Sequence, residues 1–291
     1  MDRPDPSLAK QVSDLLGFNP ETWTPINRGY TPAKRFLVKG SGGSAFVKIG
    51  VTPLTARLLN REIAVYKALS GPFIPELLGW RNDEINPILI LEDLSSAVWP
   101  PPWTDEMVTL LINQIEALHQ TPANLERRPL LYDGREAGWP TIARNPQSFL
   151  SLGLVSAAWL EAAIPLLIEA ERACEMEGDA TVHFDLRSDN ICIQNGVVMF
   201  VDWAEASVSN SAVDLGFFLP SLAYEGGPPP ETILPGSPEV AALVSGFFAA
   251  RAGLTDIPDA PLVRRVQREQ LTTALAWTQR QLKLPELDGR P

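Results

Sequence analysis

Two carboxylates and one carboxamide at fixed offsets are the part of this sequence that could do chemistry. Asp185 and Asn190 stand five residues apart, and Asp202 follows twelve residues after Asn190. An aspartate can accept the proton of a substrate hydroxyl, and the oxygens of Asn and Asp are ligands that suit Mg²⁺. Phosphoryl transfer asks a protein mainly for positioning and neutralisation of charge. These residues predict a site for ATP and Mg²⁺, with Asp185 as proton acceptor and Asn190 and Asp202 as metal ligands.

The segment between Asn190 and Asp202 is predicted to be a β-hairpin. Residues 191–194 and 197–201 each read as a strand, and Asn195-Gly196 between them is a strong two-residue turn signal because both positions tolerate positive φ. A hairpin brings its two ends together, so Asn190 and Asp202 should lie side by side. The alternative left open by the residues is a solvated turn whose acidic groups have no role.

At this point the chain resembles the aminoglycoside phosphotransferase and choline kinase group of the protein-kinase-like superfamily. The catalytic loop of that family reads His-Gly-Asp, then four residues and Asn, and a later strand ends in Asp, often followed by Trp. The matching positions here are residues 183–185, Asn190 and residues 202–203. The resemblance implies a small-molecule kinase that binds ATP and Mg²⁺.

The catalytic loop departs from the family pattern at two places. Phe184 stands where the family usually has Gly, and residues 187–189 read Arg-Ser-Asp where His-Pro-Gly is more usual. Neither departure changes the proton acceptor or the metal ligands. The resemblance implies that Arg187 lies near the transferred phosphate, as a Lys does in protein kinases. A structural or surface role for Arg187 is equally compatible with the sequence.

A strand lysine and a helix glutamate complete the expected nucleotide site. Lys48 ends a buried-looking strand, where a charge needs a partner. The order and spacing of Lys48 and Glu62 resemble the family pair, which implies that Lys48, braced by Glu62, contacts the α- and β-phosphates. The resemblance also implies that backbone groups from Glu92 to Leu94 meet the adenine. The alternative is a lysine that reaches solvent at a strand end and a solvated glutamate.

The expected phosphate-covering loop is poor in glycine. Residues 27–34 contain a single glycine where protein kinases have a glycine-rich hairpin, so no residue of the loop is assigned a role. Residues 40–43 are richer in glycine, but they lie between two strands with no helix N-terminus to direct amides at a phosphate. We interpret residues 40–43 as a plain turn.

Three residues are expected to have structural roles around the site, without direct contact with the substrates. His119, at the end of a helix, reads as a packed structural histidine. His183 is expected to brace the catalytic loop by hydrogen bonding. Asp214 resembles a family Asp that holds the backbone of this loop.

Composition and charge exclude several classes of protein. The chain has 291 residues, of which 45% are hydrophobic, two cysteines and a net charge of −11. Residues 94–291 carry 13 basic and 25 acidic residues, which argues against nucleic-acid binding. An acidic half is compatible with a cationic acceptor, but a merely soluble acidic surface is the favoured reading. The absence of a signal-like start or a long apolar run predicts a soluble, cytoplasmic protein that does not span a membrane.

The order of predicted elements indicates an α+β, two-lobed, protein-kinase-like fold. We expect an N-terminal nucleotide-binding lobe at residues 1–94, with a small antiparallel sheet and a helix, and a linker at residues 95–103. A larger, mainly helical catalytic and acceptor-binding lobe then occupies residues 104–291. Residues 123–150 read as irregular, and helices are expected near residues 239–252 and 261–283.

The predicted function is ATP- and Mg²⁺-dependent phosphoryl transfer to the hydroxyl of a small molecule. Only 11 residues separate Asp202 from Asp214, too few for the long activation segment of a protein kinase. The acceptor stays open between an aminoglycoside, a choline-like amine, an amino acid and a sugar, and the sequence does not set the oligomeric state. The alternative is a catalytically inactive nucleotide-binding or scaffold protein on the same fold.

Overall fold

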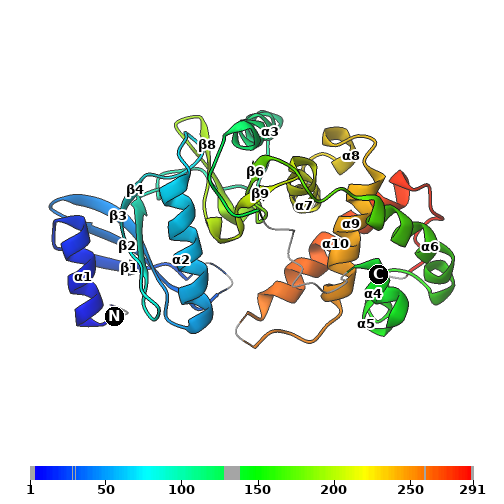
Figure 1. Cartoon of the computed structure of the whole chain (residues 1–291), viewed down its shortest axis with the longest axis horizontal. Helices are drawn as coiled ribbons and strands as arrows, with labels where there is room; N and C mark the ends of the chain where they lie inside the picture. The colour runs from blue at the N-terminus through cyan, green and yellow to red at the C-terminus, as the bar shows by residue number, and fades with distance from the viewer. Residues whose placement is uncertain (1–3, 28, 30, 128–137, 259, 290–291) are drawn as a thin grey trace. The chain divides into compact units, whose positions relative to one another are not determined.

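The computed structural model describes residues 4–27, 29, 31–127, 138–258 and 260–289 (Figure 1). The chain forms two compact units. The first unit comprises Met1–Pro100, Ala123–Leu125 and Asp189–Ala206, and the second unit comprises Pro101–Pro122, Glu126–Ser188 and Ser207–Pro291. Each unit is therefore built from segments that are far apart in the sequence.

The first unit contains a five-stranded antiparallel sheet with strand order β1-β2-β3-β5-β4. Its strands are β1 (Thr22–Pro25), β2 (Lys34–Gly40), β3 (Gly43–Ile49), β4 (Leu77–Arg81) and β5 (Ile88–Glu92). The glycine-rich segment at residues 40–43 is the tight turn between β2 and β3, because Gly40 is paired directly with Gly43.

Two helices of the first unit flank this sheet. One face carries Phe36, Val38, Val47 and other buried apolar side chains that pack with Val12 of α1 (Pro6–Leu16). Successive side chains of a strand point to opposite faces, so Lys48 lies on the other face, toward α2 (Pro53–Ala68). α2 begins at a capping box in which Thr52 and Thr55 exchange hydrogen bonds, with Pro53 at its first position.

A β-hairpin from late in the chain also belongs to the first unit. Its strands are β7 (Ile191–Gln194) and β8 (Val197–Phe200). The turn residues Asn195 and Gly196 have φ of 54° and 79°, which is the backbone that an Asn-Gly turn favours. The hairpin predicted from the sequence is present, with β8 one residue shorter than expected.

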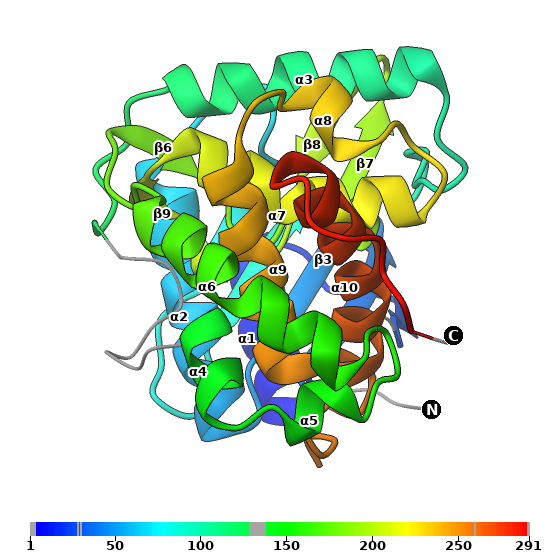
Figure 2. The same ribbon diagram turned by 90° about the vertical axis from the view of Figure 1, so that its right-hand side faces the viewer.

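The second unit is mainly helical (Figure 2). Its helices are α3 (Asp105–Gln120), α4 (Trp139–Arg144), α5 (Gln147–Leu150), α6 (Ala157–Ala173), α7 (Ser211–Tyr224), α8 (Pro230–Ile233), α9 (Pro238–Ala252) and α10 (Leu262–Gln281). α9 is buried around most of its circumference, and α4, α6, α7 and α10 pack against it. A two-stranded sheet pairs β6 (Ala180–Val182) with β9 (Ser207–Ser209).

The structure confirms the expected α+β class and adds elements that the sequence pattern did not predict. β4, the β6–β9 pair and α7 are additions, and α4 and α5 lie in a stretch that was expected to be irregular. Residues 128–137 of that stretch lie outside the described residues. Residues 189–206 belong to the first compact unit. The division expected from the sequence assigns them instead to the lobe at residues 104–291. The functional division into 1–94, 95–103 and 104–291 stays a prediction.

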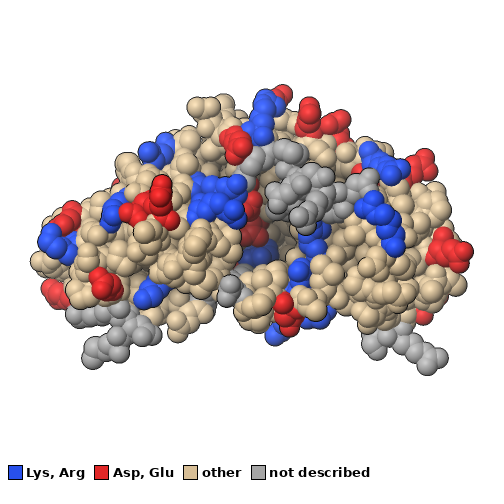
Figure 3. All heavy atoms as spheres, turned by 60° about the horizontal axis from the view of Figure 1, so that its bottom comes forward, with Lys and Arg blue, Asp and Glu red and all other residues tan. Residues whose placement is uncertain are grey.

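Charged side chains of both signs are interspersed over the face shown in Figure 3. Across the described part of the chain, every helix is too short or too polar to cross a lipid bilayer.

Candidate active site

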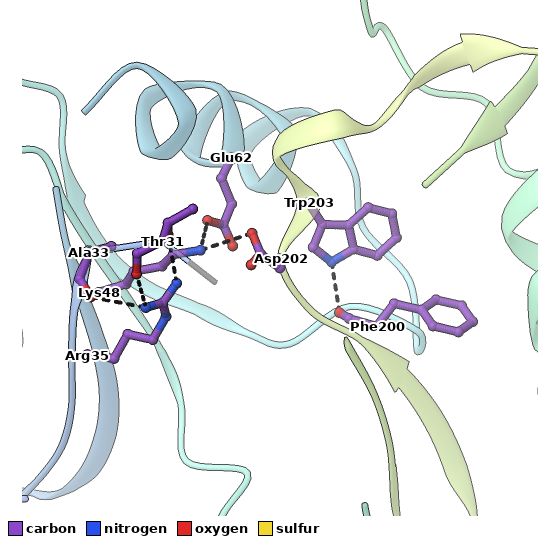
Figure 4. Close-up of polar contacts among 8 residues, drawn as sticks. All are labelled: Thr31, Ala33, Arg35, Lys48, Glu62, Phe200, Asp202 and Trp203. Atoms are coloured by element: carbon purple, nitrogen blue, oxygen red, sulfur yellow. Dashed lines mark hydrogen bonds and ion pairs between the residues drawn. The ribbon is translucent and has the colours of Figure 1, made fainter. Parts of the chain in front are cut away.

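The first unit brings Lys48, Glu62 and Asp202 into one ion cluster (Figure 4). The Lys48 Nζ donates to Glu62 Oε2 at 2.7 Å and to Asp202 Oδ1 at 3.0 Å. Lys48 lies on β3, Glu62 lies on α2, and Asp202 is the second residue after the end of β8. The sheet, the helix and the late hairpin therefore each supply one group. The side chains of Lys48 and Glu62 are almost fully buried, whereas that of Asp202 is 36% exposed.

One ammonium lies between two carboxylates, and the pKa values reflect this. Burial by itself lowers the pKa of Lys48, but the charges of Asp202 and Glu62 outweigh it, so the pKa of Lys48 lies above its ordinary value. Burial raises the pKa of Glu62, and Lys48 opposes that rise. Lys48 therefore stays protonated at neutral pH, and the cluster formed by these three side chains carries a net negative charge when both acids are ionised.

Aromatic packing fixes the backbone that presents Asp202. Trp203 is fully buried, and its Nε1 donates to the Phe200 carbonyl at 2.8 Å. Its ring lies 6.2 Å from the ring of Phe73, whose carbonyl accepts from Phe200 N at 2.8 Å. Asp202 has φ 65° and ψ 60°, a left-handed backbone that is uncommon outside glycine. Such strain persists where surrounding contacts hold it, frequently at functional sites.

The hairpin brings the backbone at Asn190 close to the backbone at Asp202, the two expected metal ligands. Val201 N donates to the Asn190 carbonyl at 3.0 Å, so Asp202 follows the residue paired with Asn190. No group of three or more His, Cys, Asp and Glu side chains suited to a metal occurs within the described residues. Mg²⁺ usually takes only one or two protein carboxylates and completes its shell with phosphates and water. The donor set of Asn190 and Asp202 fits that ion.

The segment expected to meet adenine lies at the end of β5. Glu92 ends the strand and is paired with Ala45 across the sheet. Its backbone N–H donates to the Glu76 carbonyl at 3.1 Å, and its Oε1 accepts from Glu76 N at 2.8 Å. Leu94 is buried, and its carbonyl accepts from Ala97 N at 3.1 Å. The N–H of Glu92 is thus engaged, and the role of this segment toward a base stays a prediction.

In the second unit, a buried aspartate holds residues of the expected catalytic loop by their backbone. Asp214 is fully buried in α7, and its Oδ1 accepts from Phe184 N at 2.7 Å. Its Oδ2 accepts from His183 N at 3.1 Å and contacts His119 Nε2 at 2.8 Å. Phe184 has φ 60°, which explains why glycine is the easier residue at this position. Its buried side chain joins the apolar core of this unit.

Asp185 and Arg187 lie next to each other on this loop. The Arg187 Nη1 is 3.4 Å from Asp185 Oδ1, and both side chains are partly exposed. The Asp185 N–H donates to His183 Nδ1 at 3.2 Å, so that ring nitrogen acts as an acceptor. The buried His183 thus braces the loop, and Asp185 retains a partly exposed carboxylate that could meet a substrate.

A clamp on the same loop was not anticipated from the sequence. Glu225, at the end of α7, accepts from Ser188 Oγ at 2.6 Å and from Trp103 Nε1 at 2.8 Å. Ser188 is one of the residues that replace the family's usual His-Pro-Gly. The two contacts join residues that are 37 and 122 positions apart in the sequence. No spacing rule in a single sequence predicts such pairs.

The expected phosphate-covering loop, residues 27–34, connects β1 to β2. Residues 28 and 30 lie outside the described residues. Arg35, the second residue of β2, donates from Nη1 to the carbonyls of Thr31 and Ala33 at 3.2 and 3.0 Å. Its Nη2 donates to Thr31 Oγ1 at 3.1 Å. An arginine side chain therefore supports the loop in the place of a glycine-rich backbone.

The fold and these sites define the class to which the protein belongs. The antiparallel sheet and helical second unit match the kinase-like fold of aminoglycoside phosphotransferases and choline kinases. Residues 22–236 match the model of the phosphotransferase enzyme family, APH. The chain belongs to this family, as the catalytic-loop pattern indicated. No curated protein sequence matches it.

Solved structures similar to this chain include both kinds of kinase. Aminoglycoside phosphotransferase APH(4)-Ia has a TM-score of 0.60 at 15% identity, covering 95% of this chain and 98% of that chain. A thermostable mutant of it, in ternary complex with ADP and hygromycin B, has a TM-score of 0.58 at 14% identity and covers 96% and 99%. Choline kinase LicA from Streptococcus pneumoniae has a TM-score of 0.59 at 15% identity and covers 94% and 97%. At these identities the likeness shows the fold alone.

Proposed function

We propose that this protein is an ATP- and Mg²⁺-dependent phosphotransferase that acts on the hydroxyl group of a small molecule. The observation that carries the proposal is the ion cluster of Lys48, Glu62 and Asp202. A buried cluster of this kind is weak evidence for a stabilising role, because desolvation of the ions opposes their attraction. A strand lysine held by a helix glutamate is the arrangement that places a cation on nucleotide phosphates.

The residues of the first unit would bind the nucleotide. Lys48, braced by Glu62, contacts the α- and β-phosphates and exchanges its contact with Asp202 for phosphate oxygens. Asn190 and Asp202 would hold Mg²⁺, which would supply positive charge to offset that of the phosphates. The ADP, AMP-PNP and AMP complexes of the structural neighbours support nucleotide binding on this fold.

The residues of the catalytic loop would act on the acceptor. Asp185 orients the hydroxyl and accepts its proton as the oxygen bonds to the γ-phosphorus. The bond from that phosphorus to the bridging oxygen breaks, and ADP leaves with the electron pair. Because the transfer is largely dissociative, an aspartate of ordinary basicity is sufficient. Arg187, beside Asp185, would stabilise the transferred phosphoryl group.

A cationic acceptor is the best-supported class. Residues 94–291, which contain the catalytic loop, carry 25 acidic and 13 basic residues, and such a field favours cationic ligands. Hygromycin B is the bound aminoglycoside in one structural neighbour, and another neighbour is a choline kinase. Sugars and amino acids are the remaining acceptor classes to compare.

A cytoplasmic setting is part of this proposal, and the proposed use of ATP and the two thiols support it. Cys174 and Cys192 are both free and buried, as in proteins of reducing compartments. ATP is available in that same compartment.

An acceptor screen tests the proposal. Release of ADP from Mg-ATP is measured with panels of aminoglycosides, amino alcohols, sugars and amino acids. We expect release that depends on one acceptor class and is lost in Asp185→Asn. Nucleotide binding without turnover on any acceptor would instead identify an inactive nucleotide-binding protein. In a melting assay, Mg²⁺ should add to stabilisation by ATP in the wild type and should not do so in Asp202→Ala.

A further inference from the structure

Arg35 lies directly opposite Lys48 in the sheet. The antiparallel register of β2 and β3 pairs Arg35 with Lys48 and Leu37 with Phe46. Directly opposite side chains of an antiparallel pair share one face and lie about 5 Å apart at Cβ. Arg35 and Lys48 are therefore on the face of the sheet that carries the ion cluster, whereas Phe36 and Val47 face α1.

Two cations at directly opposite positions destabilise a strand pair unless something offsets their repulsion. The charge of Arg35 is felt in the ion cluster. After burial and the two carboxylates, it is a further cause that acts on the pKa of Lys48, in the lowering direction. A bound polyanion would turn this repulsion into a shared attraction.

The guanidinium of Arg35 is hydrogen-bonded to Thr31 and Ala33, which lie between β1 and β2 (Figure 4). Nη1 donates to the carbonyls of Thr31 and Ala33, and Nη2 donates to Thr31 Oγ1. A Cβ atom built on Gly29 would lie 2.8 Å from the Arg35 Cζ, so the loop backbone passes very close to the guanidinium. Gly29 has φ 106°, and both features favour glycine at this one position.

Arg35 keeps hydrogen-bonding capacity after these contacts. A guanidinium has five N–H donors, and the contacts with the loop use three of them. Within the described residues, Nε and the second hydrogen of Nη2 find no acceptor. Arginine is well suited to phosphate because its planar group donates two parallel hydrogen bonds.

We propose that Arg35 is a second phosphate-binding cation of the nucleotide site, beside Lys48, and that it takes over the task of the missing glycine-rich loop. It supports Thr31 and Ala33 through their carbonyls and gives its remaining donors to the phosphates of a nucleoside di- or triphosphate. This inference rests on the proposed function. A neutral side chain could bond the same carbonyls, so a purely structural role does not require a cation opposite Lys48.

Calorimetric titration of ATP, ADP and AMP into wild type, Arg35→Gln and Arg35→Lys tests the proposal. Arg35→Gln should lose at least about tenfold in affinity for ATP and ADP, the effect of a hydrogen bond to a charged group. AMP binding should be nearly unchanged. Arg35→Lys keeps the charge without the planar fork and should fall between wild type and Arg35→Gln. If Arg35→Gln does not fold, Arg35→Lys must by itself show selective loss of ATP and ADP.

The matched control is Lys10→Gln, which removes one positive charge from an exposed position of α1, the helix on the other side of the sheet. It should bind all three nucleotides as the wild type does. Unchanged ATP affinity in Arg35→Gln overturns the inference and leaves the proposed function intact. An equal loss for ATP and AMP also overturns it, because that result assigns Arg35 to loop structure alone. A wild type that binds no ATP overturns the proposed function itself.

Discussion

The ion cluster of the first unit and the catalytic loop of the second unit are held in place by opposite means. In the cluster, Lys48, Glu62 and Asp202 hold one another through charge. In the loop, Asp214 holds a stretch of chain through its backbone N–H groups. A charge cluster depends on the identity of each side chain, whereas every residue except proline offers the same backbone N–H.

This difference accounts for the departure at Phe184, where Asp214 accepts from the backbone N–H. The departure at residues 187–189 is different, because Ser188 is held by Glu225 through its own hydroxyl. The residues of the ion cluster match the family pattern. At Phe184 the backbone contact is open to any residue except proline, whereas the ion cluster requires the charge of each of its side chains.

The largest expected effect is on the loop, where Asp185→Asn removes the proposed proton acceptor. We expect kcat to fall by roughly 10²- to 10⁴-fold, with little change in melting temperature, because the side chain is 36% exposed and Asp214 still holds the backbone. Asp189→Asn is the matched control, since Asp189 is an exposed carboxylate on the same loop. A similar loss of kcat in both variants would contradict the role of Asp185.

Lys48→Met should break the ion cluster. Removing one partner leaves the buried Glu62 without its cation, and we expect a loss of roughly 4 kcal/mol in the free energy of unfolding. The double variant Lys48→Met/Glu62→Leu should regain most of that loss, because it removes both buried charges. Urea denaturation measures both. If Lys48→Met is as stable as the wild type, charge does not hold this region together.

Asp214→Asn tests the backbone contacts of the second unit. The amide keeps the size of the side chain but offers one acceptor oxygen in place of two, so at least one buried N–H loses its partner. We expect a loss of about 2 kcal/mol in the free energy of unfolding, together with a lower kcat. The affinity for ATP should stay near that of the wild type. A clear loss of ATP affinity in Asp214→Asn would abolish the contrast between the two regions.

The smallest expected effect concerns the reactivity of two thiols, Cys192 in the first unit and Cys174 in the second unit. Burial raises the pKa of Cys192 and of Cys174 to about 12, so both thiols should react slowly with a maleimide at about pH 8. Unfolded thiols ionise near pH 8.5, so the unfolded chain binds fewer protons between that pH and 12. Stability should therefore fall as the pH rises through this window.

Nucleotide should separate the two thiols. Cys192 lies on β7, two residues after Asn190, and ATP with Mg²⁺ should slow its labelling further. Cys174 ends α6 in the second unit, and its labelling rate should change less. Cys174→Ser and Cys192→Ser assign the two rates. Equal protection of both thiols would mean that the two units open together.

The sequence predicted those features that depend on local chemistry. The Asn195-Gly196 turn required positive φ at both positions, and the structure has it. The motif order predicted the family and the fold class, and both are confirmed. The roles of the individual site residues stay predictions, although Lys48 and Glu62 do form an ion pair.

The features that were missed depend on contacts between distant residues. β6 and β9 have three residues each, and Ala180 pairs with Ser209, which no local period can indicate. α7 is buried on most sides and contains Gly216 and Pro220, so it lacks both an amphipathic period and an uninterrupted run of helix formers. The Glu225 clamp depends on this helix and could not be predicted without it.

The first unit is assembled from separate chain segments, and this limits when it can be completed during synthesis. This unit takes its last stretch from Asp189–Ala206. A ribosome therefore synthesises β1 to β5 long before Asp202, and until then Lys48 and Glu62 lack the third member of the ion cluster. A fragment that ends at Pro100 would have the same deficit. This unit, whose proposed role is to bind nucleotide, contains the first part of the chain to be translated, and it can be completed only after residue 206 of 291 has been synthesised.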